Sequence, residues 1–277
     1  MTGQSRDHRS GVDATSGNVL CTVEDGICRL TLNRPAKLNA LNLAIFREIA
    51  GHLDRLSTLE VACMVLSGAG RSFCAGHDLD DLASGDEAGL EAERLENGLI
   101  ERLALLPFPV VAKVRGHCYT GGLELVLAAD IIIAADTARF ADTHAKFDLV
   151  PIWGLTQRLP RRIGVAKAKE MMFSSRTYSG VQAAAMNLVN AAVPDHDLDA
   201  YVDALCADIA ANSRRSNREI KKLLVDTDGL NLAAGNAWEL HHSPGHGPEF
   251  AAMIASRRPG AIESPLLRGE TNEASPE

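Results

Sequence analysis

The fold is decided by the stretch Val114-Arg-Gly-His-Cys-Tyr-Thr-Gly-Gly-Leu-Glu-Leu-Val-Leu-Ala-Ala-Asp-Ile-Ile-Ile133. It predicts the end of an apolar strand that begins at Pro109, a glycine-bearing turn, a short helix from Gly121 and a second strand from Asp130. The first turn of a helix presents backbone N–H groups and a positive dipole end, which suit a developing oxyanion. Glu124 follows less than one turn later. The stretch therefore indicates acid–base chemistry beside a carbonyl group.

Outward from this stretch, strands alternate with helices up to about Ser179, and helices follow. Two strands at 18–23 and 27–32 are joined by a turn, a helix covers 45–56, and a strand follows at 62–66. We expect the acidic segment 81–98 to be a surface loop that leads into a helix carrying Leu99, Leu103 and Leu106. A pair of helices is expected from Leu155. The later helices are expected at 181–186, 198–210, 217–225, 230–241 and 250–256.

This order of elements predicts the α/β class, with a helical C-terminal part. We place the folded core at 18–195 and the C-terminal helical region at 196–260. Flexible tails are expected at 1–17 and 261–277, where the sequence is polar or rich in Pro, Gly and Glu.

Composition narrows the function. The 277 residues are 46% hydrophobic and 23% charged with a net charge of −8, which is ordinary for a globular protein and argues against nucleic acid as a partner. The basic run 158–169 is either a solvated helix face or a segment that attracts a phosphorylated ligand.

The six cysteines and nine histidines show no metal spacing, so no metal is expected and the thiols are predicted to be reduced core residues. No apolar run could span a bilayer and no signal peptide is recognisable, so a cytoplasmic protein without a membrane partner is expected.

A second loop, Ser72-Phe-Cys-Ala-Gly-His-Asp-Leu79, follows a predicted strand. Its small residues Ala75 and Gly76 allow a ligand to approach the backbone closely, and the N–H of His77 is then a candidate donor. The alternative is a plain turn between a strand and a helix. Together with the turn at Gly121, this loop would supply a second donor to one oxygen.

Four motifs in this order give the chain a recognisable pattern. They are Leu32-Asn-Arg-Pro-Ala-Lys-Leu-Asn-Ala-Leu41, Ser72–Leu79, Gly116–Asp130 and Gly154-Leu-Thr-Gln-Arg-Leu-Pro160. With them, the chain from about Val19 to Ser256 resembles the crotonase (enoyl-CoA hydratase/isomerase) superfamily. The resemblance implies a spiral of ββα units whose C-terminal helices mediate trimerisation, in a homotrimer or a dimer of trimers.

The resemblance also implies a substrate and a site. The substrate would be an acyl-CoA thioester whose carbonyl is held by the N–H groups of His77 and Gly121, with no cofactor apart from the coenzyme A that the substrate carries. The side chain of His77 is a further candidate for a catalytic imidazole, although the motif asks only for its N–H. The substrate site would be lined by Lys37, Leu38, Ala40, Ala75, His77, Asp78, Leu79, Gly121, Gly122 and Trp153.

Hydratases of this superfamily use two glutamates that bracket one water molecule. Glu124 matches the first, and its apolar neighbours favour a buried catalytic carboxylate over a surface charge. Twenty residues later His144 stands where the second glutamate is expected. A neutral imidazole can position water or shuttle a proton, or His144 could merely fill the loop. Asp142 and Asp148 are nearby carboxylates that could substitute, or else turn and surface residues.

Bulky residues flank the expected acyl pocket. Trp153 and Tyr119 either shorten this pocket or simply pack in the core. The resemblance implies an enoyl-CoA hydratase, a lyase, with catalytic residues Glu124, His144, His77 and Gly121. Because the second glutamate is missing, an enoyl-CoA isomerase, a thioester hydrolase, a decarboxylase and a non-catalytic acyl-CoA binding protein remain open. A serine hydrolase is set aside, since the chain has no Gly-x-Ser-x-Gly motif.

Overall fold

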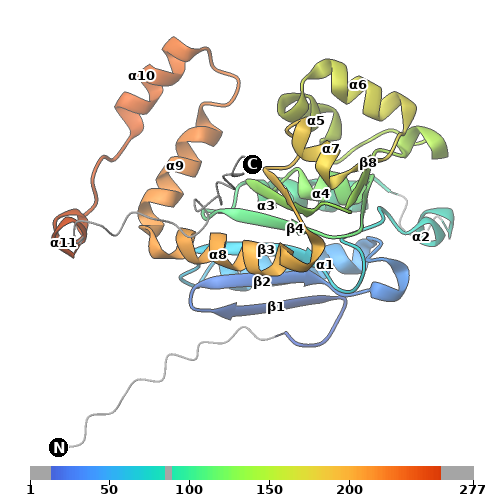
Figure 1. Ribbon diagram of the computed structural model, residues 1–277, viewed down its shortest axis with the longest axis horizontal. Coiled ribbons are helices and arrows are strands. Elements are labelled where there is room, and N and C mark those ends of the chain that lie inside the picture. The colour runs from blue at the N-terminus through green and yellow to red at the C-terminus, as the bar shows by residue number, and fades with distance from the viewer. Residues whose placement is uncertain (1–13, 85–88, 257–277) are drawn as a thin grey trace, which may run out of the picture.

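The computed structural model describes residues 14–84 and 89–256, and its centre is a six-stranded sheet in the order β1-β2-β3-β4-β6-β9 (Figure 1). The first two strands form the predicted antiparallel hairpin, and every later strand joins in parallel. The strands are β1 (Val19–Glu24), β2 (Ile27–Leu32), β3 (Cys63–Gly68), β4 (Val110–Val114), β6 (Ile131–Ala135) and β9 (Ala191–Val193).

A second, three-stranded sheet has the order β5-β7-β8, with β5 (His117–Tyr119), β7 (Arg139–Ala141) and β8 (Tyr178–Ser179). Strands β5 and β7 are parallel, and β8 pairs with β7 antiparallel. Two isolated bridges extend this region, one between Cys74 and Cys118 and one between Leu41 and His77. The first brings the loop that follows β3 against β5, and the second brings the same loop against the segment before α1 (Leu43–Leu56).

Helices surround both sheets, and most of them lie where the sequence predicts them. Helix α1 shows why: the side chain of Asn42 accepts a hydrogen bond from Ile45 N at 3.2 Å, and the apolar face behind this cap is buried. The helices are α1 (Leu43–Leu56), α2 (Leu79–Ser84), α3 (Leu90–Ala104), α4 (Gly121–Val126), α5 (Leu155–Ile163), α6 (Val165–Ser174), α7 (Gly180–Ala185), α8 (Leu198–Ala211), α9 (Arg214–Asp226), α10 (Leu232–His242) and α11 (Phe250–Ser256), with 3-10 turns η1 (Pro35–Lys37), η2 (His144–Phe147) and η3 (Asp195–Asp197).

The prediction of a loop at 81–98 is wrong. Helix α2 extends to Ser84 and helix α3 already begins at Leu90. Residues 96, 99, 100 and 103 are all buried and share one face of α3, but the first of them is Glu96. A carboxylate at an inward position interrupts the apolar periodicity that identifies a helix.

The interior of the main sheet is buried on both faces, as parallel strands covered by helices require. Val110, Val111 and Ala112 of β4 are all buried, and α8 packs across β3, β4 and β6 (Figure 1). All six cysteines are buried and none forms a disulfide, as predicted. In the part of the chain that the structure describes, no helix combines the length and apolar character that a membrane span requires.

The domain limits remain predictions. Residues 1–13 and 261–277 of the two expected tails lie outside the described residues. Helices α9, α10 and α11 extend from one side of the main body (Figure 1). They carry the exposed apolar side chains Ile220, Leu224, Leu232, Leu240 and Phe250.

Candidate active site

The two glycine-containing loops lie directly against each other. Cys74 N donates to His117 O at 2.9 Å, and Tyr119 N donates to Cys74 O at 3.0 Å. A Cβ on Gly122 would fall 2.7 Å from the carbonyl oxygen of Cys74, so only glycine fits there without displacement of the backbone. Gly122 therefore serves to bring the two loops together, and it does not line the cavity that they form.

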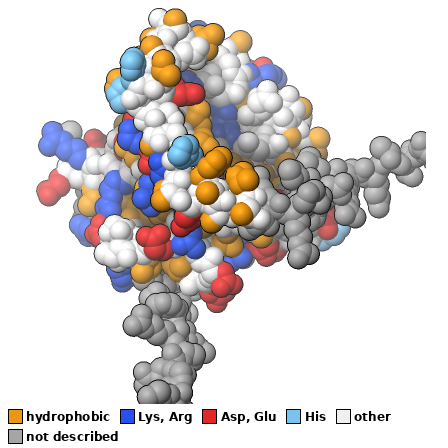
Figure 2. All heavy atoms as spheres, turned by 90° about the vertical axis from the view of Figure 1, so that its left-hand side faces the viewer, with side chains coloured by type: hydrophobic (Ala, Val, Ile, Leu, Met, Phe, Trp, Pro, Cys, Tyr) orange, Lys and Arg blue, Asp and Glu red, His pale blue; other side chains and the backbone are white. Residues whose placement is uncertain are grey.

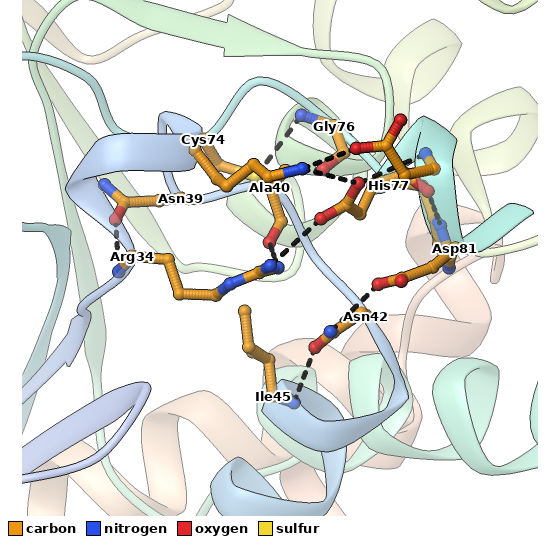
Figure 3. Close-up of polar contacts among 12 residues, drawn as sticks. Arg34, Asn39, Ala40, Asn42, Ile45, Cys74, Gly76, His77 and Asp81 are labelled. Carbon is orange, nitrogen blue, oxygen red and sulfur yellow. Dashed lines mark hydrogen bonds and ion pairs between the residues drawn. The ribbon is translucent and has the colours of Figure 1, made fainter.

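The predicted substrate-lining segments also run side by side. Leu41 N donates to Gly76 O at 2.8 Å, and Ala75 N donates to Leu38 O at 3.0 Å. Arg34 fixes the turn between them, since its guanidinium donates to Ala40 O at 2.9 Å and to the buried carboxylate of Asp78 at 3.0 Å (Figure 3). These contacts hold Leu38, Ala40 and Asp78 beside the second loop.

Lys37 lies at the exposed end of this arrangement. Its Nζ contacts Asp80 Oδ2 at 2.5 Å and Asp78 Oδ1 at 3.8 Å. The cavity described next is not lined by Lys37, Leu38, Ala40 or Asp78.

A cavity of about 450 Å³ opens between the two loops, α3 and η2. It brings together, from segments far apart in the sequence, the predicted residues Ala75, His77, Leu79, Gly121, Glu124, His144 and Trp153. Among the described residues, no three side chains of the His, Cys, Asp and Glu types converge as a metal site would require.

Glu124 is the most deeply buried acid of this cavity. Its side chain is 1% exposed, and its Oε1 accepts hydrogen bonds from Trp153 N at 3.0 Å and from Leu155 N at 3.3 Å. Burial raises the pKa of Glu124 to about 7, although the neighbouring imidazole of His144 and the two backbone donors oppose this rise. Near neutral pH the carboxyl group can therefore both accept and donate a proton.

His144 faces this carboxyl group from the N-terminus of η2. Its Nδ1 lies 2.6 Å from Asp142 Oδ1, and its Nε2 lies 3.6 Å from Glu124 Oε2. Asp142 is buried and also accepts a hydrogen bond from His144 N at 3.1 Å. Of the two nearby carboxylates, Asp142 thus belongs to the site, whereas Asp148 is exposed in a left-handed turn outside it.

Trp153 packs over the turn at Gly121 and also lines the cavity. A Cβ on Gly121 would lie 2.5 Å from Trp153 Cζ3, which means that the indole rests on the glycine itself. The indole contacts the ring of Phe46 at a centroid distance of 5.0 Å and the ring of His77 at 5.6 Å. The indole therefore reduces the space beside the expected position of the thioester. Tyr119 lines the same cavity.

The sequence reasoning missed Glu96. This residue of α3 is buried, lines the cavity, and places Oε1 3.4 Å from His77 Nε2. The sequence contains one signal for it. Glu96 lies three residues before Leu99 and seven before Leu103, a spacing that puts all three on the same buried helix face.

Comparisons with known proteins agree with the residue pattern. The family model described as enoyl-CoA hydratase/isomerase matches residues 22–244. The chain is 36% identical to 1,2-epoxyphenylacetyl-CoA isomerase of Escherichia coli over 87% of its own length and 97% of that protein. It is 34% identical to a protein of Arabidopsis thaliana named a probable peroxisomal enoyl-CoA hydratase, over 80% of this chain and 82% of the relative.

A solved structure extends the similarity to three dimensions. The crystal structure of an enoyl-CoA hydratase from Bacillus anthracis superimposes with a TM-score of 0.81 at 30% identity, covering 86% of this chain and 95% of the other. The expected fold is thereby confirmed.

Proposed function

The chain belongs to the enoyl-CoA hydratase/isomerase (crotonase) family, and from this premise we propose that it is an enoyl-CoA hydratase. Such an enzyme adds water across the 2,3 double bond of an enoyl-CoA thioester. The observation that carries the proposal is the 3.6 Å distance between His144 Nε2 and Glu124 Oε2. One water molecule can lie about 2.8 Å from both atoms at once. An imidazole and a carboxyl group would then bracket the water.

The substrate would bind through its carbonyl and its coenzyme A moiety. The N–H groups of His77 and Gly121 would polarise the thioester carbonyl, and each such donor contributes about 3–4 kcal/mol to stabilisation of the enolate-like transition state. The neighbouring segments 37–40 and 75–79 would contact the coenzyme A. No cofactor is needed in this scheme beyond the coenzyme A of the substrate.

Proton transfer would involve both side chains. The short contact to Asp142 favours a proton on His144 Nδ1, which leaves the lone pair of Nε2 to accept a proton from water. As the water oxygen bonds to C3, Glu124 in its protonated form gives its proton to C2. The proton on His144 then returns to Glu124, and the 3-hydroxyacyl thioester leaves.

A double-bond shift is the second candidate activity. Glu124, with its pKa raised to about 7, can remove a proton from C2 of a 3-enoyl thioester and return it to C4. This reaction needs no bound water and no second carboxylate. The similarity to an isomerase over nearly the whole length of that relative supports keeping this candidate.

The deciding experiment follows the enoyl absorbance with crotonyl-CoA and a longer 2-enoyl-CoA, and separately with a 3-enoyl-CoA. Hydration predicts that absorbance falls with the first two substrates, and that Glu124→Gln abolishes the fall. Glu24→Gln, which alters an exposed residue at the end of β1, is the control and should leave the rate unchanged. If the enoyl absorbance rises with the 3-enoyl-CoA and does not fall with crotonyl-CoA, the enzyme is an isomerase instead. Tight binding without turnover would mean a carrier.

We also propose that the protein forms homotrimers or dimers of trimers. Figure 2 shows hydrophobic side chains gathered on the face that carries the C-terminal helices, and Leu232 and Leu240 are 80% and 79% exposed. Burial of such side chains against a neighbour is favourable. Light scattering should give three or six times the chain mass of 29.6 kDa, and a monomer would contradict this proposal. The cytoplasmic location stays a prediction.

A further inference from the structure

Glu96 is a buried carboxylate whose partners are too few for its charge. Its side chain is 5% exposed, and its one hydrogen-bond contact among the described residues is His77 Nε2 at 3.4 Å. A carboxylate has about four acceptor sites, and burying it without strong donors is costly. Because Glu96 lines the cavity, a ligand in the cavity can supply the missing donor.

Trp153 lines the same cavity as Glu96. Its indole Nε1 is buried and has no hydrogen-bond partner within the described part of the chain. The indole ring and the Glu96 carboxylate both contact the imidazole of His77, so the two groups flank one side chain. An indole N–H can only donate a hydrogen bond, and a carboxylate can only accept one.

These two requirements define the ligand group. It must donate to Glu96 and accept from Trp153, which an alcohol does and an ammonium group cannot do. The N–H of His77 would bind the carbonyl oxygen, while its ring extends toward Glu96. The ligand group therefore belongs on the acyl chain, beyond C3.

We propose that the acyl pocket selects thioesters whose acyl chain carries a hydroxyl group beyond C3, bound between Glu96 and Trp153. This proposal rests on the proposed function only for the acyl-CoA ligand and its orientation. It assigns Glu96 and Trp153 as specificity-determining residues, which act on the substrate tail and not on the reacting carbons.

Calorimetry with saturated thioesters tests this proposal without any turnover, because these ligands have no double bond to hydrate. The probes are three pairs: butyryl-CoA with 4-hydroxybutyryl-CoA, pentanoyl-CoA with 5-hydroxypentanoyl-CoA, and hexanoyl-CoA with 6-hydroxyhexanoyl-CoA. In at least one pair the hydroxylated member should bind about tenfold more tightly, as expected for a hydrogen bond to a buried charged group.

Substitutions test which side chains cause the preference for the hydroxylated thioester. Glu96→Leu should remove the preference for the hydroxylated thioester. It should leave the affinity for the plain thioester within about twofold, since only the hydrogen bond to the hydroxyl group is lost. Trp153→Phe, which keeps an aromatic ring and removes the N–H donor, should reduce the preference as a second and independent variant. The matched control is Glu91→Leu, an exposed residue of the same helix that does not line the cavity, and it should retain the preference.

Two outcomes would overturn the proposal. One is equal affinity within all three pairs for the unmodified protein, which would leave the hydratase proposal untouched. The other is an equal loss of affinity for both members of a pair in Glu96→Leu, which would mean that Glu96 only holds His77 in place.

Discussion

Asp142 holds His144 by two contacts, a hydrogen bond of 2.6 Å to the imidazole Nδ1 and one of 3.1 Å to the backbone N–H. Both side chains are buried, so neither contact is exchanged freely with water. The imidazole is thereby fixed with Nε2 directed at Glu124, 3.6 Å from its Oε2. Asp142 is thus a positioning residue, because it acts on the reaction through His144.

Asp142→Asn should lower kcat for hydration by about a hundredfold, which is within the range that acid–base groups contribute. The amide can present its NH₂ group to Nδ1, and Nε2 would then carry the proton and could no longer accept one from water. KM should change little, since Asp142 is distant from the coenzyme A moiety in the proposed complex. Steady-state kinetics of Asp148→Asn, an exposed aspartate six residues later, supply the control. Equal kinetics in the two variants would remove Asp142 from the mechanism.

Gly121→Ala should lower hydration by about 10²–10³-fold, because the new Cβ would meet the indole of Trp153 at 2.5 Å and displace the turn that carries the proposed oxyanion donor. A smaller side chain in place of the indole should relieve the clash. The double variant Gly121→Ala with Trp153→Leu is therefore expected to hydrate at least about tenfold faster than Gly121→Ala alone, a non-additivity typical of residues in contact. Gly122→Ala is the matched comparison. Its Cβ would meet the backbone of Cys74, so Trp153→Leu should not rescue it. Rescue of both variants would argue against the steric explanation.

Lys221→Met should lower the free energy of unfolding by about 2 kcal/mol, since it leaves the buried carbonyl of Phe108 without its donor and removes the ion pair with Asp130. Lys221 Nζ donates to Asp130 Oδ2 at 2.7 Å and to Phe108 O at 3.1 Å, and these contacts attach α9 to the start of β6. Denaturant unfolding measures the change. The adjacent Lys222→Met removes only an exposed ion pair with Asp226 and should cost less than about 1 kcal/mol. Similar losses in the two variants would contradict this assignment.

Stability should depend on pH through Glu124. Its pKa is raised from 4.5 to about 7 in the folded protein, so the folded state binds the proton more tightly than the unfolded chain does. The resulting stabilisation is complete below the unfolded pKa and is lost as the pH rises through the folded pKa. Glu124→Gln does not titrate. Its unfolding free energy relative to the unmodified protein should therefore rise by about 2–3 kcal/mol between about pH 5 and pH 8. A difference that stays constant over this range would mean that Glu124 is not protonated by burial.

The strands, the helices after Ser179 and both glycine loops could be predicted, because each depends on short apolar periodicities and small residues that a single segment displays. Glu96 is missed by apolar periodicity because it breaks that periodicity in its own helix, and only its spacing from Leu99 and Leu103 places it on the buried face. Asp142 was ambiguous for a different reason. A carboxylate two residues before a histidine is common in turns, and only the three-dimensional structure brings the resulting pair to Glu124.

The candidate site has one part built from backbone atoms and another built from side chains. The main-chain hydrogen bonds between Cys74 and the segment 117–119 fix the backbone part. The proposed carbonyl-binding groups are backbone atoms whose spacing is set by this pairing, whereas the rest of the cavity is lined by side chains carried by α3, α4, η2 and the turn before α5. A single nucleotide change can alter Glu96, His144 or Trp153 and leave the pairing of the two loops intact. Such a scaffold is evolvable, since new reactions can arise by substitution around a backbone frame that is inherited unchanged.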